Sequence, residues 1–185
     1  MIKKLSRNII GDLCKYNNYT EEQEEQMEYT LRVFLYEVIK IIIIVLILAV
    51  FGHLKEAILI LGIMSITKPF IGGYHEDSQI RCFLATFILV LAIILLANTS
   101  DLSLVSLFII NLISIFCVYN KAPVINYKMP LTRKDLIKRN RFIGITNIII
   151  LSIISLIMFK VKWFSQIIVW TNIIQVMFMF NKYEK

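Results

Sequence analysis

The feature that most limits how this chain can fold is a succession of long apolar runs that carry almost no charge. A helix needs roughly 20 largely apolar residues to cross the hydrocarbon core of a bilayer, which is about 30 Å thick. Hydrophobic residues make up 58% of the chain, whereas soluble domains contain about 45–50%. The sequence therefore excludes an ordinary soluble domain and predicts an all-α polytopic membrane protein.

We expect six membrane spans in a single domain that covers residues 1–185. Four apolar runs approach the length of a span unaided, whereas the first two are shorter and must recruit flanking residues. The expected spans are residues 20–51, 57–71, 82–97, 102–119, 142–159 and 163–180. Residues 1–19 have apolar side chains at helical spacing, which predicts an amphipathic helix on the membrane surface. Thr20 and Gln23 predict a capping box at the start of the next helix.

Cationic residues are concentrated in the expected loop of residues 120–141, which carries seven Lys and Arg side chains against one Asp. Because Lys and Arg accumulate on the cytoplasmic side of membrane proteins, we expect this loop to face the cytoplasm. Six spans then place both termini on that side, together with the polar segment that follows Gly72. The net charge of +7 indicates contact with anionic lipid, and nucleic acid is not an expected partner.

Polar residues inside the apolar runs are costly in lipid, and most such residues hold helices together. We expect Asn111, Ser155 and Gln175 to hydrogen-bond neighbouring spans rather than to take part in catalysis. Glu37 and Lys40 stand three residues apart near the start of the first span. They either line a polar cavity or form an ion pair at the membrane edge, and the ion pair is favoured.

Most known catalytic and metal-binding patterns are missing from the sequence. It contains no G-x-S-x-G nucleophile elbow, no phosphate-binding loop with a Walker lysine and no H-E-x-x-H helix motif. The two histidines, His53 and His75, are expected on opposite sides of the membrane and are too few for a His-based metal site. We therefore expect no metal and no cofactor. An odd number of cysteines argues against a disulfide framework.

The pair that can carry chemistry is His75 with Cys82. A thiol becomes a good nucleophile when an imidazole takes its proton or when it lies at the N-terminus of a helix. Ser78, or the residue before it, is placed to cap the helix that holds Cys82. Seven residues of continuous helix would separate the two side chains by about 10.5 Å, so a dyad requires a fold-back that Gly72 and Gly73 permit. The alternative is a structural cysteine and an interfacial histidine.

The run Gly72-Gly73-Tyr74-His75, with Cys82 seven residues after the histidine, resembles the active-site motif of the accessory gene regulator protein B (AgrB) family. These proteins are integral-membrane cysteine peptidases of bacterial peptide quorum sensing. Ala122-Pro123 and Pro130-Leu131, with Lys128 between them, resemble the family's second cytoplasmic loop. Chain length and the six-span layout also match, so the resemblance covers nearly the whole chain.

The resemblance implies that Cys82 is the nucleophile and that His75 is the general base and acid. The implied substrate is an AgrD propeptide with an amphipathic leader, a central Cys or Ser and an acidic tail. Cleavage before the tail would lead to a cyclic thiolactone or lactone. The implied enzyme is a homodimer in the bacterial cell membrane, with its active site on the cytoplasmic side.

The cationic loop suits the acidic tail that the resemblance implies, although a plain topology signal explains the same charges. A competing hypothesis is a non-catalytic membrane transporter or peptide-export component in which His75 and the loop bind a ligand. That hypothesis predicts that Cys82→Ser is tolerated. The candidate substrate-binding residues are Lys128, Arg133, Lys134, Lys138 and Arg139.

Overall fold

In the computed structural model, the described residues are 2–16, 19–73, 78–124 and 133–180, and within them the fold is entirely helical. This part of the chain forms seven helices and no β-strand, which confirms the all-α prediction. The helices are α1 (Ile2–Tyr16), α2 (Glu21–Val50), α3 (Leu54–Ile71), α4 (Gln79–Thr99), α5 (Leu104–Lys121), α6 (Lys134–Ile157) and α7 (Lys162–Met177).

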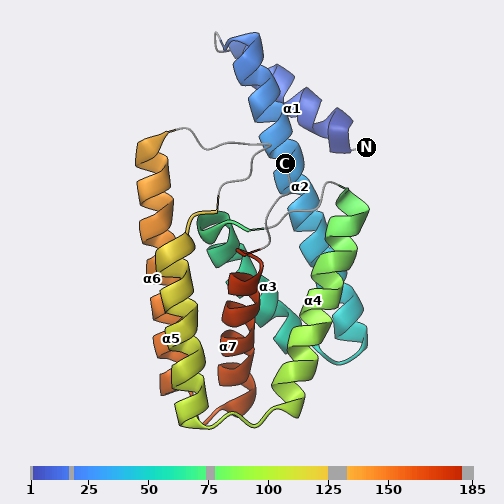
Figure 1. Ribbon diagram of the computed structural model, residues 1–185. Helices are drawn as coiled ribbons and strands as arrows, with labels where there is room; N and C mark the ends of the chain where they lie inside the picture. The colour runs from blue at the N-terminus through green and yellow to red at the C-terminus, as the bar shows by residue number, and fades with distance from the viewer. Residues whose placement is uncertain (1, 17–18, 74–77, 125–132, 181–185) are drawn as a thin grey trace.

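Four of the described helices, α2, α4, α5 and α6, are long and apolar enough to cross a membrane. The two other candidates are shorter or more charged, since α7 has 16 residues and α3 contains Lys55, Glu56 and Lys68. Both lie in the middle of the bundle (Figure 1), and α7 packs against α3, α4, α5 and α6. The chain is therefore a membrane protein, and the count of six spans stays a prediction.

The longest helix, α2, projects beyond the bundle. It has 30 residues and is about 45 Å long, which exceeds the thickness of a bilayer core. At its start, the Gln23 N–H donates to the Thr20 hydroxyl over 3.3 Å and the Thr20 N–H donates to the Gln23 side chain over 3.1 Å. These two bonds confirm the predicted capping box. The Glu-rich N-terminal half of α2 is the part that projects (Figure 1).

The N-terminal helix α1 packs against α2 (Figure 1). Ile10 is buried, and Arg7 Nε lies 3.4 Å from Glu28 Oε2 of α2. Ile9 and Leu13 stay exposed. These exposed apolar side chains suit contact with lipid, so the role of α1 as a surface anchor remains the prediction for this helix.

Helix α6 begins at Lys134, well before the expected start of its span at residue 142. Lys and Arg are good helix formers, and Asp135 in the first turn suits the positive end of the helix dipole. The basic segment therefore continues the helix instead of forming a loop. Because α5 extends to Lys121, the connection between the two helices is shorter than the expected loop of residues 120–141.

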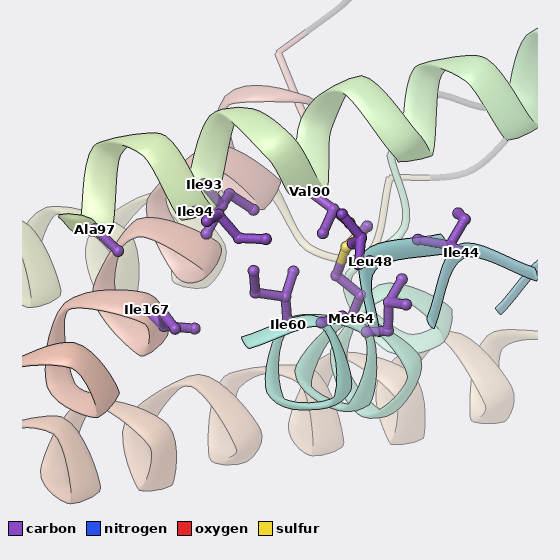
Figure 2. Packing of buried hydrophobic residues seen from close by; sticks show 11 residues of the cluster. Ile44, Leu48, Ile60, Met64, Val90, Ile93, Ile94, Ala97 and Ile167 are labelled. Atoms are coloured by element: carbon purple, nitrogen blue, oxygen red, sulfur yellow. The ribbon is translucent and has the colours of Figure 1, made fainter. Parts of the chain in front are cut away.

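One apolar cluster of the interior lies between α2, α3 and α4 (Figure 2). Its buried members include Ile44 and Leu48 of α2, Ile60 of α3 and Val90 of α4, and Ile167 of α7 joins the same cluster. Lipid tails are as apolar as these side chains, so close packing rather than exclusion of water stabilises the contacts. The cluster holds α4 against α2 and α3, and so positions the start of α4.

Polar side chains link neighbouring helices as expected. Asn111 Nδ2 of α5 donates to Ser155 Oγ of α6 over 2.8 Å, and Asn147 Nδ2 of α6 donates to the Ile66 carbonyl of α3 over 2.6 Å. Both bonds are interhelical. They confirm the prediction that Asn111 and Ser155 hold spans together.

Two connecting segments meet at one end of the bundle. Helices α3, α5 and α7 end there, and α4 and α6 begin there (Figure 1). Gly72 pairs with Val124 in an isolated parallel β-bridge, and the Val124 N–H donates to the Ile71 carbonyl over 2.9 Å. The segment after α3 is thereby held against the segment after α5. We call this end of the bundle the Cys82 end.

The β-bridge requires glycine at its first position. Gly72 has a φ of 75°, a conformation that side chains with a Cβ rarely adopt. A Cβ on Gly72 would also collide with the backbone oxygen of Val124. Conformation and close approach therefore both exclude a larger residue.

We expect Gly72→Ala to lower the unfolding temperature of the detergent-solubilised protein, because strain at a positive φ costs roughly 1–3 kcal/mol. Gly62→Ala is the matched control, since Gly62 lies inside α3 and an added Cβ meets no atom within 4 Å. The control should be neutral or stabilising. Thermal unfolding in one detergent measures both, and equal melting temperatures would contradict the role given to Gly72.

Candidate active site around Cys82

Cys82 lies at the end of the first turn of α4. The helix begins at Gln79 after the N-cap Ser78, and the Cys82 N–H donates to the Ser78 carbonyl over 2.8 Å. The Ser78 side chain makes no capping hydrogen bond to α4. N–H groups left unpaired at a helix N-terminus attract negative charge. The position of Cys82 therefore favours an anionic sulfur.

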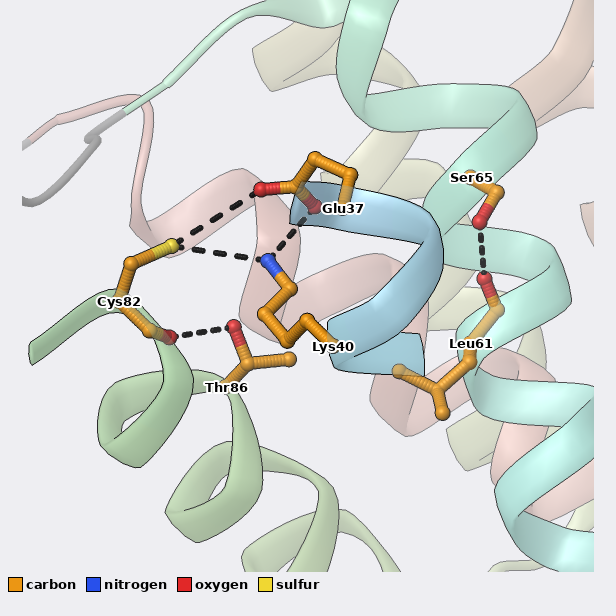
Figure 3. Close-up of polar contacts among 6 residues, drawn as sticks. All are labelled: Glu37, Lys40, Leu61, Ser65, Cys82 and Thr86. Atoms are coloured by element: carbon orange, nitrogen blue, oxygen red, sulfur yellow. Dashed lines mark hydrogen bonds and ion pairs between the residues drawn. The ribbon is translucent and has the colours of Figure 1, made fainter. Parts of the chain in front are cut away.

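The Cys82 sulfur contacts a charged pair on α2 (Figure 3). Lys40 Nζ lies 3.5 Å from Cys82 Sγ, and Glu37 Oε1 lies 4.0 Å from the same atom. Lys40 and Glu37 are joined by an ion pair of 2.6 Å. This bond confirms the ion pair expected from the sequence.

Sequence reasoning missed that this ion pair lies against Cys82. The residues are separated by more than 40 positions, and no local pattern connects them. One signal was available, because charged residues beside an apolar run are expensive in lipid and often mark a functional site. Only the packing of α2 against α4 reveals which site they belong to.

A cavity of about 50 Å³ opens beside Cys82. The end of α3 and the segment after it form one wall, and α4 and α7 form the others. Its polar and backbone lining comes from Lys68, Gly72, Gly73, Cys82, Thr86 and Gln175, and its apolar lining comes from Met64, Ala85, Leu89 and Phe178. The predicted nucleophile and the two glycines of the motif thus share one cavity.

One polar side chain of the cavity wall has a donor without a partner. Gln175 of α7 is buried, and its Oε1 lies 2.6 Å from the Thr67 hydroxyl of α3, whose single hydrogen is shared with the Ile63 carbonyl at 2.7 Å. The contact between α7 and α3 confirms the interhelical role expected from the sequence. The Gln175 Nε2 is buried and has no hydrogen-bond partner among the described residues. Buried polar groups are nearly always paired, so an unpaired amide beside a candidate nucleophile is a candidate functional group.

Two predicted site residues, His75 and Lys128, lie outside the described residues. The structure therefore tests neither the dyad nor the position of that lysine. Gly73, two residues before His75, lines the cavity, and Ser78, three residues after it, caps the helix of Cys82. The motif is thus anchored on both sides of the histidine.

The remaining cationic candidates stand at the start of α6, at the Cys82 end of the bundle (Figure 1). All of them are exposed, and within the described part of the chain none has an ion-pair partner. Arg141, in the next turn, donates to the Tyr119 carbonyl over 2.9 Å and ties α6 to α5. The exposed candidates are Arg133, Lys134, Lys138 and Arg139.

All three cysteines are free thiols, and Cys82 has the Lys40 ammonium beside it. Cys117 packs against an apolar cluster at the end of α5. Burial and the nearby Glu24 carboxylate raise the pKa of the Cys14 thiol on α1, which keeps that thiol protonated. Among the described residues, no group of three His, Cys, Asp or Glu side chains is placed to hold a metal ion.

Comparison with known proteins adds to this geometry. The sequence profile of the family described as Accessory gene regulator B matches residues 6–179. AgrB-like protein 1 of Clostridium perfringens strain 13 (Type A) is 45% identical over 184 residues, which cover 100% of this chain and 98% of the relative. An AgrB-like protein of Clostridium perfringens strain SM101 (Type A) is 27% identical over 169 residues, which cover 86% of this chain and 79% of the relative.

No solved structure matches the chain. The family profile and the relative at 45% identity both extend across the cavity residues and the start of α6. The chain therefore belongs to the accessory gene regulator B family.

Proposed function

We propose that this chain is a membrane-embedded cysteine endopeptidase that removes the C-terminal tail of an AgrD-type propeptide and cyclises the remainder. The observation that carries the proposal is the position of Cys82, at a helix N-terminus, in a cavity wall and 3.5 Å from a lysine ammonium. Helix dipole and cation both favour the thiolate, which is the nucleophilic form of cysteine.

The first step is acyl transfer to the enzyme. The Cys82 thiolate attacks the carbonyl carbon of the peptide bond before the tail, and a carbon–sulfur bond forms. When the tetrahedral intermediate collapses, the carbon–nitrogen bond breaks and the leaving amine takes a proton from His75. The products are an acyl-enzyme thioester and the free tail.

The second step releases a cyclic peptide. An internal thiol or hydroxyl of the propeptide gives its proton to His75 and attacks the thioester carbon, and the bond from that carbon to the Cys82 sulfur breaks. With a thiol, one thioester replaces another, so the exchange needs little driving force. Water competes by hydrolysing the thioester, and the apolar walls of the cavity, Met64, Leu89 and Phe178, limit its access.

The role of His75 follows from family membership and from chain connectivity. His75 follows Gly73, which lines the cavity, by two positions in the sequence. The positive φ of Gly72 and of Gly73 supplies the turn that a dyad with Cys82 requires. We propose His75 as the general base and acid on these grounds.

Gln175 is proposed as the oxyanion donor. The negative charge that develops on the scissile carbonyl oxygen needs a preorganised hydrogen-bond donor. The hydrogen bond from Thr67 holds the Gln175 amide through its oxygen, which leaves the Nε2 hydrogens for the substrate. Because Gln175 and Cys82 line the same cavity, the amide can serve a carbonyl that is attacked there.

The start of α6 is proposed to receive the acidic tail. Arg133, Lys134, Lys138 and Arg139 are exposed, and the β-bridge between Gly72 and Val124 joins their connecting segment to the cavity. Electrostatic attraction would bring the tail to this surface and place the preceding bond near Cys82. Lys128, in the same connection, is proposed for the same role.

The membrane setting is proposed from the charges and from the family. We propose that the Cys82 end, and with six spans both termini, face the cytoplasm of the bacterial cell, because the start of α6 is cationic. A homodimer is proposed from family membership alone. The competing proposal is a non-catalytic transporter or peptide-export component. That proposal assigns no role to the contact between Lys40 and Cys82.

The first prediction concerns the dyad. Cys82→Ser or His75→Ala should reduce cleavage by roughly a thousandfold or more, because each removes a reacting group. Cys14→Ser and Cys117→Ser are the controls and should keep wild-type activity. The assay measures tail release from the propeptide encoded by the short reading frame expected beside the gene. Wild-type cleavage by Cys82→Ser would exclude the enzyme and favour the transporter.

A second prediction concerns Gln175. Gln175→Ala should lower kcat for cleavage by roughly 100-fold, as removal of one oxyanion donor does in other hydrolases. The rate at which iodoacetamide alkylates Cys82 should stay unchanged, because that reaction develops no carbonyl oxyanion. A parallel fall in both rates would mean that Gln175 supports the fold of the site and not the transition state.

A third prediction concerns the tail. Replacing Arg133, Lys138 and Arg139 together by Glu should raise KM by about tenfold with little change in kcat, and added salt should weaken binding to the unmodified protein. The control replaces Lys55 and Lys160, which lie at the opposite end of the bundle, by Glu. An unchanged KM would mean that these charges do not bind the tail and only set the orientation of the protein in the membrane.

A further inference from the structure

The ion pair with Glu37 does not by itself explain why the Lys40 side chain is buried. Its side chain is only 10% exposed, whereas that of Glu37 is 43% exposed. A lysine paired for stability at a membrane edge would extend its ammonium toward water. Here the ammonium instead lies inside the bundle and contacts the Cys82 sulfur (Figure 3).

Lys68 of α3 lines the same cavity as Cys82. The region around the sulfur therefore holds two lysines, Lys40 and Lys68, and the carboxylate of Glu37. Attraction between an anionic sulfur and the Lys40 ammonium would be stronger in this low dielectric than in water.

The distances show which charged group lies nearer to the sulfur. Cys82 Sγ lies 3.5 Å from the Lys40 ammonium and 4.0 Å from the Glu37 carboxylate, which is long for a hydrogen bond to sulfur. The cation is therefore the nearer of the two groups and is placed to stabilise negative charge on the sulfur.

We propose that Lys40 is a third functional residue of the site: its ammonium is the fixed counter-ion of the Cys82 thiolate, and Glu37 orients that ammonium through their ion pair. This inference rests on the proposed function, because it concerns the nucleophile of that reaction. In that reaction His75 takes the Cys82 proton and later gives it to the leaving amine, while the Lys40 ammonium stabilises the thiolate. Lys40 acts on the reactivity of the sulfur whether or not a propeptide is present.

The test measures alkylation of Cys82 by iodoacetamide at neutral pH, in the full-length Cys14→Ser, Cys117→Ser chain in membranes. Lys40→Met should slow alkylation and propeptide cleavage by about tenfold, the effect of a tenfold smaller thiolate fraction. Lys40→Arg should restore both rates to within about threefold, because it keeps the charge. Lys55→Met, at the opposite end of the bundle, removes the same charge and should change neither rate.

Two further variants keep the test decisive. Lys40→Gln keeps a hydrogen-bond donor without the charge, so it replaces Lys40→Met if the methionine variant does not fold, and it should show the same loss. Glu37→Gln keeps the Lys40 cation and loses only the group that orients it, so it should slow alkylation less than Lys40→Met does. A larger loss in Glu37→Gln than in Lys40→Met would make the carboxylate the partner of the thiol and overturn the proposal.

Wild-type alkylation in a folded Lys40→Met or Lys40→Gln protein also overturns the proposal. That outcome leaves the proposed function intact if Cys82→Ser still abolishes cleavage. Conversely, cleavage by Cys82→Ser would overturn the proposed function, while the alkylation rates still report on the contact between Lys40 and the sulfur.

Discussion

A polar side chain within a membrane has no water to bind, so it must find its partner inside the protein. The candidate site is built under this constraint. Glu37 holds the Lys40 ammonium, which is 10% exposed, and Thr67 holds the buried Gln175 amide. The first pair holds Lys40 Nζ beside the Cys82 sulfur, and the second holds Gln175 in the wall of the cavity that Cys82 lines. The requirement that stabilises the helix bundle therefore also places the polar groups around the sulfur.

The β-bridge between two connecting segments is the second feature on which the candidate site depends. The Gly72 to Val124 bridge holds the segment after α3 against the segment after α5, and the latter leads to the cationic start of α6. One end of the bundle thus carries both the cavity lined by Cys82, the candidate nucleophile, and exposed positive charge. A propeptide whose scissile bond precedes an acidic tail needs both features within reach of each other.

Prediction succeeded where the signal is local. Apolar runs indicated helices because a chain in lipid must satisfy its backbone hydrogen bonds internally, and the Thr20 capping box needs only four consecutive residues. It was less accurate at the start of α6, because hydropathy marks where lipid contact begins and not where the helix begins. Span count stayed open for the same reason, since α3 and α7 are central helices whose charge or length departs from a simple span.

By itself, the sequence determined that this is a helical membrane protein, and the spacing of Gly72, Gly73, His75 and Cys82 indicated its family. Those properties depend on composition and on residues close together in the chain. Only the tertiary structure decided that Lys40 lies against Cys82 and that Gln175 shares its cavity. Such contacts join residues on different helices, and their existence depends on how the helices pack, which no local pattern encodes.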